Sequence, residues 1–266
     1  MHSNHSSHRV GLRCAVALLV LLALPGCATT AADRLEAEHS DAKANSHLEL
    51  GVDHMENGRY AHGLRELLVA ETFQPTNPRV HAALAEAYMR KGKVVEAEAH
   101  LIRALEIDPK YHDVRLNLSG LYLMIGRYQD AAVQAQALVD DATFPAVWRA
   151  YTNRAIAEMR LGNNAVAREQ LDLAVEYNKN YWPALLSLGI LEQKEGRPVE
   201  AISFFRRTLE QKPTAGARAE ANYRMAEIYV SLGKREEAVD RLMAAIVQTP
   251  EGKWGRKSEE YLKILR

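Results

Sequence analysis

Hydrophobic, small and polar positions follow the same order six times along the chain. A glycine marks each repeat, and successive marks are 34, 34, 36, 34 and 37 residues apart: Gly58, Gly92, Gly126, Gly162, Gly196 and Gly233. A near-constant period of this length is typical of stacked units, none of which can bury its apolar face alone. The pattern therefore predicts an all-α chain of helix-turn-helix units.

The residues around each glycine explain how two helices could pair. Small residues stand seven before and five after the glycine, for example Ala85 and Ala97 around Gly92, and large apolar residues stand beside them. Small residues let paired helices approach closely, while the larger ones fill the remaining space. The glycine suits a left-handed turn that ends the first helix. Prolines end the second helix in four of the repeats: Pro75, Pro109, Pro213 and Pro250.

This order of residues resembles the tetratricopeptide repeat, most closely in the second unit, which holds Leu84, Ala85, Tyr88, Gly92, Ala97, Ala104 and Pro109. The resemblance implies a right-handed superhelix of six units, with bounds 44–77, 78–111, 112–145, 148–181, 182–215 and 219–252. Ala146 and Val147 would lengthen one junction, and Gly216 to Arg218 another. Residues 253–266 have helical spacing and are predicted to cap the last apolar face.

The first 26 residues are predicted to be a secretory signal. Arg9 and Arg13 precede an uncharged apolar run over residues 14–24, which is shorter than the about 20 apolar residues that cross a bilayer. The stretch Leu24-Pro25-Gly26-Cys27 then resembles the bacterial lipobox. That resemblance implies that Cys27 is acylated and becomes the mature N-terminus. An ordinary cleaved signal that happens to contain a cysteine is the alternative.

Residues 27–43 are predicted to be a lipidated tether, which would reach roughly 50 Å if fully extended. Ala28 is not the aspartate that resembles an inner-membrane retention signal, so the expected location is the periplasmic face of the outer membrane. Without residues 1–26, Cys27 is the only cysteine. No disulfide can then form within the mature chain, and its stability must come from packing.

Composition argues against several classes of function. Lys plus Arg and Asp plus Glu number 34 each, so no basic excess favours nucleic acid. The chain has no phosphate-binding glycine loop and no catalytic elbow or metalloprotease motif, which predicts that it is neither an enzyme nor cofactor-dependent. No metal site is predicted either: His47 and His54 lack a third ligand and are interpreted as surface residues. The expected state is a monomer that binds another protein.

The resemblance to tetratricopeptide proteins also implies that the first helix of each unit lines a concave groove. Apolar residues at i, i+4 and i+7 on these helices share one face. Packing against neighbouring helices is the alternative for each of them, but as a set they suggest a groove for an apolar or amphipathic segment. The predicted groove residues are Leu48, Val52, Met55, Met89, Leu116, Leu123, Met124, Ile156, Met159, Leu186 and Ile190.

Lipobox, short tether and six repeats together resemble the type IV pilus pilotins, the PilF/PilW/Tgl family. The stretch Asp140 to Pro145 and the turn Asn178 to Asn180 are similar to stretches of that family. The resemblance implies an outer-membrane lipoprotein needed for the pilus secretin to insert and multimerise, in pilus biogenesis and motility. The alternative is a lipid-anchored scaffold for peptidoglycan enzymes or outer-membrane assembly factors.

Overall fold

The computed structural model describes residues 30–265 of the chain. The predicted signal segment 1–26 and the predicted lipidation site Cys27 lie outside the described residues. The chain divides into two compact units, residues 1–39 and residues 40–266. All pockets and helix pairs considered below belong to the second unit.

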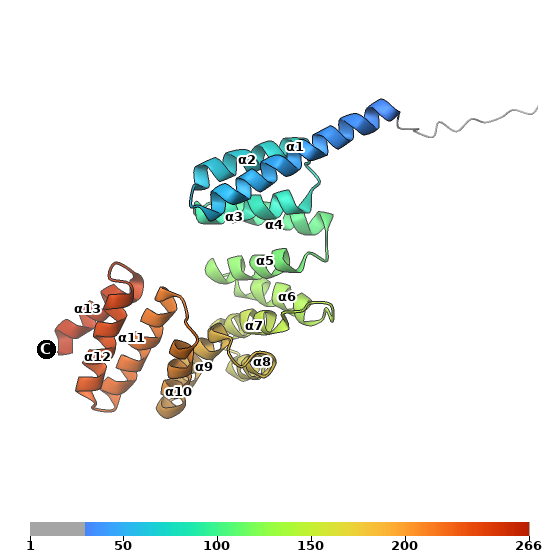
Figure 1. Cartoon of the computed structure of the whole chain (residues 1–266). Coiled ribbons are helices and arrows are strands. Elements are labelled where there is room, and N and C mark those ends of the chain that lie inside the picture. Colours follow the sequence, from blue (N-terminus) through green and yellow to red (C-terminus); the bar gives the residue numbers. More distant parts are fainter. Residues whose placement is uncertain (1–29, 266) are drawn as a thin grey trace, which may run out of the picture. The chain divides into compact units, whose positions relative to one another are not determined.

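Residues 30–265 contain thirteen α-helices and no strand (Figure 1). The helices are α1 (Ala31–Glu56), α2 (Tyr60–Phe73), α3 (Pro78–Arg90), α4 (Val94–Ile107), α5 (His112–Met124), α6 (Tyr128–Val139), α7 (Val147–Leu161), α8 (Asn164–Tyr177), α9 (Trp182–Lys194), α10 (Pro198–Glu210), α11 (Ala215–Ser231), α12 (Arg235–Gln248) and α13 (Lys253–Leu265). The predicted all-α class, with repeated helix-turn-helix units and a final capping helix, is confirmed over these residues.

A left-handed turn at each repeat glycine ends the first helix of every pair. All six glycines have a positive φ, between 70° and 91°, which residues with a side chain rarely adopt. The residue after each glycine donates its backbone N–H to the carbonyl oxygen five residues earlier. Lys93 does so to Tyr88 at 2.9 Å, and Lys234 to Tyr229 at 2.8 Å. This is the hydrogen bond of a Schellman motif, so the predicted turn is confirmed.

The helices of a pair come closest where a small residue of the first faces a large residue of the second. A Cβ added to Gly189 in α9 would lie 2.5 Å from the ring of Phe205 in α10. A Cβ added to Gly51 in α1 would lie 2.8 Å from Leu67 in α2. Phe205 and Leu67 are both fully buried. The two helices of a pair can therefore come this close only because Gly189 and Gly51 have no side chain. The order of residues predicts small residues at these positions.

The tether predicted over residues 27–43 is not extended where the structure describes it, because α1 already begins at Ala31. A reciprocal cap starts the helix: the Thr30 Oγ1 accepts a hydrogen bond from the Asp33 N–H at 3.1 Å, and the Asp33 carboxylate accepts one from the Thr30 N–H at 2.8 Å. This is a capping box with aspartate in place of glutamate. The Asp41 carboxylate also accepts a hydrogen bond from Gln74, so residues before 44 already contact the repeats.

The junction predicted at Gly216 to Arg218 is also corrected, since these residues form the first turn of α11. Thr214 explains the early start, because its hydroxyl accepts a hydrogen bond from the Ala217 N–H at 3.3 Å. A threonine at this position satisfies a backbone donor that the helix leaves unpaired. At the other lengthened junction Ala146 stays in the loop, while Val147 begins α7.

The last helix, α13, covers the apolar end of the repeats. Leu262 is buried in the same cluster as residues of α10, α11 and α12, and Tyr261 and Leu265 pack against that cluster. The rings of Trp254 and Tyr223 lie 5.2 Å apart between centroids. Of the described helices, none combines the length and hydrophobicity needed to span a membrane.

We expect Gly189→Ala to destabilise the fold, because the new methyl group must displace the buried ring of Phe205. Such overpacking costs about 1–3 kcal/mol. Gly120 in α5 is the matched control, since a Cβ added there meets nothing within 4 Å. Gly120→Ala should stabilise by about 0.5–1 kcal/mol through helix propensity. Urea unfolding of both variants measures the two effects, and equal stabilisation by both would contradict the close contact.

Candidate partner-binding face

We call the surface formed by the first helices of the pairs, α1, α3, α5, α7, α9 and α11, the odd-helix face. Along it α5 packs against α7, α7 against α9, and α9 against α11. Residues of α1, α3, α5, α7, α9 and α11, with residues just outside their ends, line four separate pockets. A row of pockets on one side of a helical stack is suited to an elongated ligand.

Ten of the eleven predicted groove residues line these pockets. Leu123 is the exception, because it packs against the buried core cluster that contains Leu121 and Tyr122. The ten differ in exposure: Leu48, Leu116 and Leu186 are buried, whereas Val52 and Met124 are exposed. The buried members form the floor of the pockets, where they already pack against other side chains of the protein. The exposed members remain available to a ligand.

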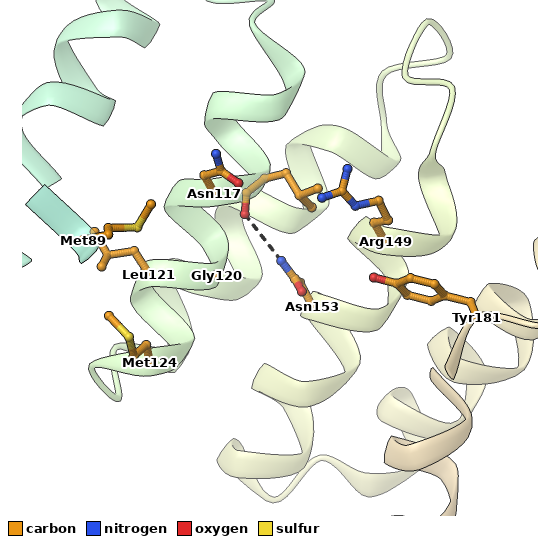
Figure 2. A pocket seen from close by; sticks show the side chains of 9 residues that line it. Met89, Asn117, Gly120, Leu121, Met124, Arg149, Asn153 and Tyr181 are labelled. Carbon is orange, nitrogen blue, oxygen red and sulfur yellow. Dashed lines mark hydrogen bonds between the residues drawn. The ribbon is translucent and has the colours of Figure 1, made fainter. Parts of the chain in front are cut away.

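One pocket, of about 300 Å³, lies between α3, α5 and α7 (Figure 2). Met89 from α3 and Met124 from α5 stand on one side of it, and Asn153 and Arg149 from α7 on the other. Methionine side chains adapt to ligands of different shape. Gly120 leaves the middle of α5 without a side chain, which opens the floor between them.

Polar groups fix the α7 side of this pocket. The Asn153 amide donates to the Leu116 carbonyl oxygen at 3.5 Å and lies 3.4 Å from the Ser119 hydroxyl. Arg149 and Tyr181 both line this pocket (Figure 2). Burial raises the pKa of Tyr181, and the positive charge of Arg149 opposes that rise. The phenol therefore stays neutral at physiological pH and can donate a hydrogen bond to a ligand in the pocket.

A larger pocket, of about 470 Å³, lies between α7, α9 and α11. Its lining is mostly apolar and includes four of the predicted groove residues, two on α7 and two on α9, about one turn apart on each helix. The apolar lining residues are Ile156, Met159, Trp182, Pro183, Leu186 and Ile190. A cavity of this size with an apolar lining holds one or two apolar side chains of a partner.

The rim of this larger pocket is basic. Arg160, Lys194 and Arg224 line it together with a single acidic residue, Glu220. Glu220 pairs with Arg224 at 2.8 Å, within one turn of α11. The Lys194 ammonium donates to the Asn164 side chain at 3.0 Å, and both Lys194 and Arg160 are exposed. This combination favours an apolar segment that carries acidic residues beside it.

The two pockets over α1 and α3 are smaller and more polar. They measure about 260 and 270 Å³ and share an acidic residue, Glu86. Val52 lines both, and Met55 lines one. The Met55 side chain is already used within the protein, because it covers the space above Gly63. The strongest apolar site therefore lies toward the C-terminal repeats.

Sequence reasoning missed several residues of these pockets. Tyr111 and Tyr181 line two of them, and each stands fifteen residues before a repeat glycine, which is a signal that the sequence offers. The two histidines interpreted as surface residues are partly buried: His47 lies 2.7 Å from Glu66, and the Nδ1 of His54 is buried without a partner. The lack of enzyme activity stays a prediction.

Comparison with known proteins gives consistent matches. Two family models, each described as tetratricopeptide repeat, match residues 91–154 and 192–254, and residues 48–112 and 152–216. Together these matches run without a gap from residue 48 to residue 254. The chain is also similar to the type IV pilus assembly protein PilF of Pseudomonas aeruginosa, at 23% identity over 196 residues, which cover 73% of this chain and 78% of that one.

Two solved structures extend the similarity. PilW, described as a widely conserved type IV pilus biogenesis factor, matches with a TM-score of 0.70 and 18% identity, over 80% of this chain and 97% of PilW. The structure of Pseudomonas aeruginosa PilF matches with a TM-score of 0.68 and 18% identity, over 84% of this chain and 99% of PilF. At this identity the structural matches show the common fold.

The division of the predicted groove residues into buried floor residues and exposed residues can be tested by replacing single side chains with alanine. Leu116 is 4% exposed and Met124 is 64% exposed, and both line the same pocket. Leu116→Ala should lower the free energy of unfolding by about 2–5 kcal/mol, because it leaves a cavity. Met124→Ala should change it by less than about 0.5 kcal/mol. Chemical denaturation distinguishes them, and similar losses for both would show that Met124 belongs to the core.

Proposed function

The chain belongs to the tetratricopeptide repeat family, and we propose that it serves in type IV pilus biogenesis as a pilotin for the pilus secretin. In this role it is acylated at Cys27, sits at the periplasmic face of the outer membrane, and binds an apolar segment of the secretin until that segment enters the membrane. The proposal combines the similarity to PilF, over 78% of that protein's length, with the geometry of the odd-helix face.

The observation that carries the proposal is the pocket between α7, α9 and α11. A secretin subunit has to cross an aqueous compartment with a segment destined for lipid, and exposed apolar surface of that kind promotes aggregation. The apolar lining of this pocket, which includes Ile156 and Ile190, offers the segment a place to bury its side chains. Burial is favourable by about 25 cal/mol for each Å² of apolar surface removed from water.

The basic rim would give the pocket its preference among apolar segments. Lys194 on α9 and Arg160 on α7 both line it and are exposed. Opposite charges at the edge of an interface raise the association rate and exclude partners with like charge. We therefore expect the bound segment to carry aspartate or glutamate next to its apolar residues.

The acyl chains would supply the second half of the mechanism. Each methylene buried in the bilayer contributes about 0.8 kcal/mol, and two chains already anchor a protein stably. A protein held in this way delivers its bound segment to the membrane without a long diffusive search. The short helical segment Ala31–His39, which precedes the second unit, would connect the anchor to the repeats.

Charge reversal of the rim tests the binding role without disturbing the core. Arg160→Glu combined with Lys194→Glu should weaken secretin binding by about 10-fold or more, because the rim then repels acidic residues. In a strain that lacks the chromosomal gene, this double variant should fail to restore heat-resistant secretin multimers, as seen by blotting. Both residues are exposed, so the thermal midpoint should change little.

The matched control is Arg206→Glu combined with Lys234→Glu. Both residues are exposed and line a different pocket, formed mainly by α10 and the turn that follows α11. This variant has the same change of charge and should restore the multimers. Normal multimers with the rim variant would refute binding at this pocket. Normal multimers in the deletion strain itself, with cell-wall hydrolases as the main co-purified proteins, would favour the scaffold alternative.

Cys27→Ser tests the anchor independently of the groove. Without the thiol no thioether lipid can form, so the protein should leave the membrane fraction and appear in the soluble periplasmic fraction. Its mass should also lack the acyl chains. The purified variant should still bind the secretin segment, because the repeats are unchanged. A Cys27→Ser protein that stays in the outer-membrane fraction would show that lipid does not hold the chain there.

A further inference from the structure

Three side chains that the groove does not use converge at the junction of the first two repeats. Glu71 comes from α2, His81 from α3 and His100 from α4. The Nδ1 atoms of the two histidines lie 3.0 Å apart. The Oε1 atom of Glu71 lies 3.5 Å from the Nδ1 of His81 and 3.9 Å from the Nδ1 of His100.

These separations match those of ligands around one small metal ion. A circle through three atoms that are 3.0, 3.5 and 3.9 Å apart has a radius of about 2.0 Å. Zinc binds histidine nitrogen at about 2.0–2.1 Å and carboxylate oxygen at about 2.0–2.2 Å. A single ion near the centre of the triangle would therefore be at bonding distance from all three atoms, without a large movement of any helix.

The surroundings hold the histidine rings in the orientation that a metal requires. The Nε2 of His81 lies 2.9 Å from the carbonyl oxygen of Pro75, so it must carry the proton, which leaves the lone pair on Nδ1. Histidines that bind metals usually donate their other N–H in this way. The ring of His100 stacks on Tyr88, with centroids 5.3 Å apart. His81 is only 4% exposed, so its ring is fixed by packing.

We propose that Glu71, His81 and His100 form a binding site for a divalent transition metal of the zinc class. Two imidazoles and one carboxylate are a set that suits zinc, copper or nickel better than calcium or magnesium. The side chain of Glu71 is 30% exposed, so the site opens toward solvent on that side. Water can occupy the fourth position of a tetrahedral ion there.

The ring of His100 lies mostly out of water, beside Glu71 and His81. Burial lowers the pKa of His100, Glu71 opposes this effect, and the nearby His81 adds to it. Bound metal would connect α2 of the first repeat to both helices of the second and would stabilise that junction, in addition to any function of the groove.

Titration of ZnCl2 into the full chain, stripped with EDTA and kept in detergent, tests the site by calorimetry. The wild-type chain should bind one equivalent more than His100→Gln or Glu71→Gln. At that site each variant should weaken binding by at least about 100-fold, more than the roughly 10–100-fold loss caused by removing an outer-shell partner. Zn²⁺ should also raise the thermal midpoint of the wild type by several degrees, and that of the variants much less.

His47→Gln is the control, because His47 and Glu66 form a similar pair without a third ligand. It should bind Zn²⁺ like the wild type. Binding elsewhere, including at His2, His5 and His8 where the full chain retains them, would be equal in all four proteins. Equal stoichiometry in wild type, His100→Gln and Glu71→Gln would overturn the proposal, and His81 and His100 would then share only a hydrogen bond. Cobalt(II) should give the visible spectrum of a tetrahedral site in the wild type and in His47→Gln, but not in His100→Gln or Glu71→Gln.

Discussion

The contact between a small residue and a large one within each helix pair is the constraint on which the fold depends. Phe205 packs against Gly189, which has no side chain, and Leu67 packs in the same way against Gly51. Such fitted contacts set the distance between two helices. That distance places the first helices in one row, and the pockets lie along this row. The binding face is therefore a consequence of how each pair is packed.

The sequence predicts most of this fold because its period is set by local chemistry. The six glycines have to adopt a left-handed turn, and the small residues must face large ones, so both appear directly in the order of residues. Helix starts are harder to predict. The cap at Thr30 and Asp33, and the one at Thr214, were missed because short polar caps do not follow the repeat. Because of these caps, α1 begins within the predicted tether and α11 begins within the predicted junction.

The site could be predicted only in part. Helical spacing finds the residues of one face, but it does not separate Leu116, which its neighbours bury, from Met124 on the same face. That difference depends on the helices on either side. Convergence from separate helices is likewise invisible in the sequence. Glu71, His81 and His100 have no metal-site spacing, and the three come together only because α2, α3 and α4 pack side by side.

The central claim, that the odd-helix face binds an apolar segment of the secretin, is tested most directly by photocrosslinking in cells. A photoreactive amino acid at Met124 or Lys194 would lie on that face, and one at Val95 or Val247 would be exposed on α4 or α12. The account predicts a crosslink to the secretin from Met124 and Lys194 and none from the other two positions. Crosslinks from Val95 or Val247 alone, or to no secretin at any position, would contradict it.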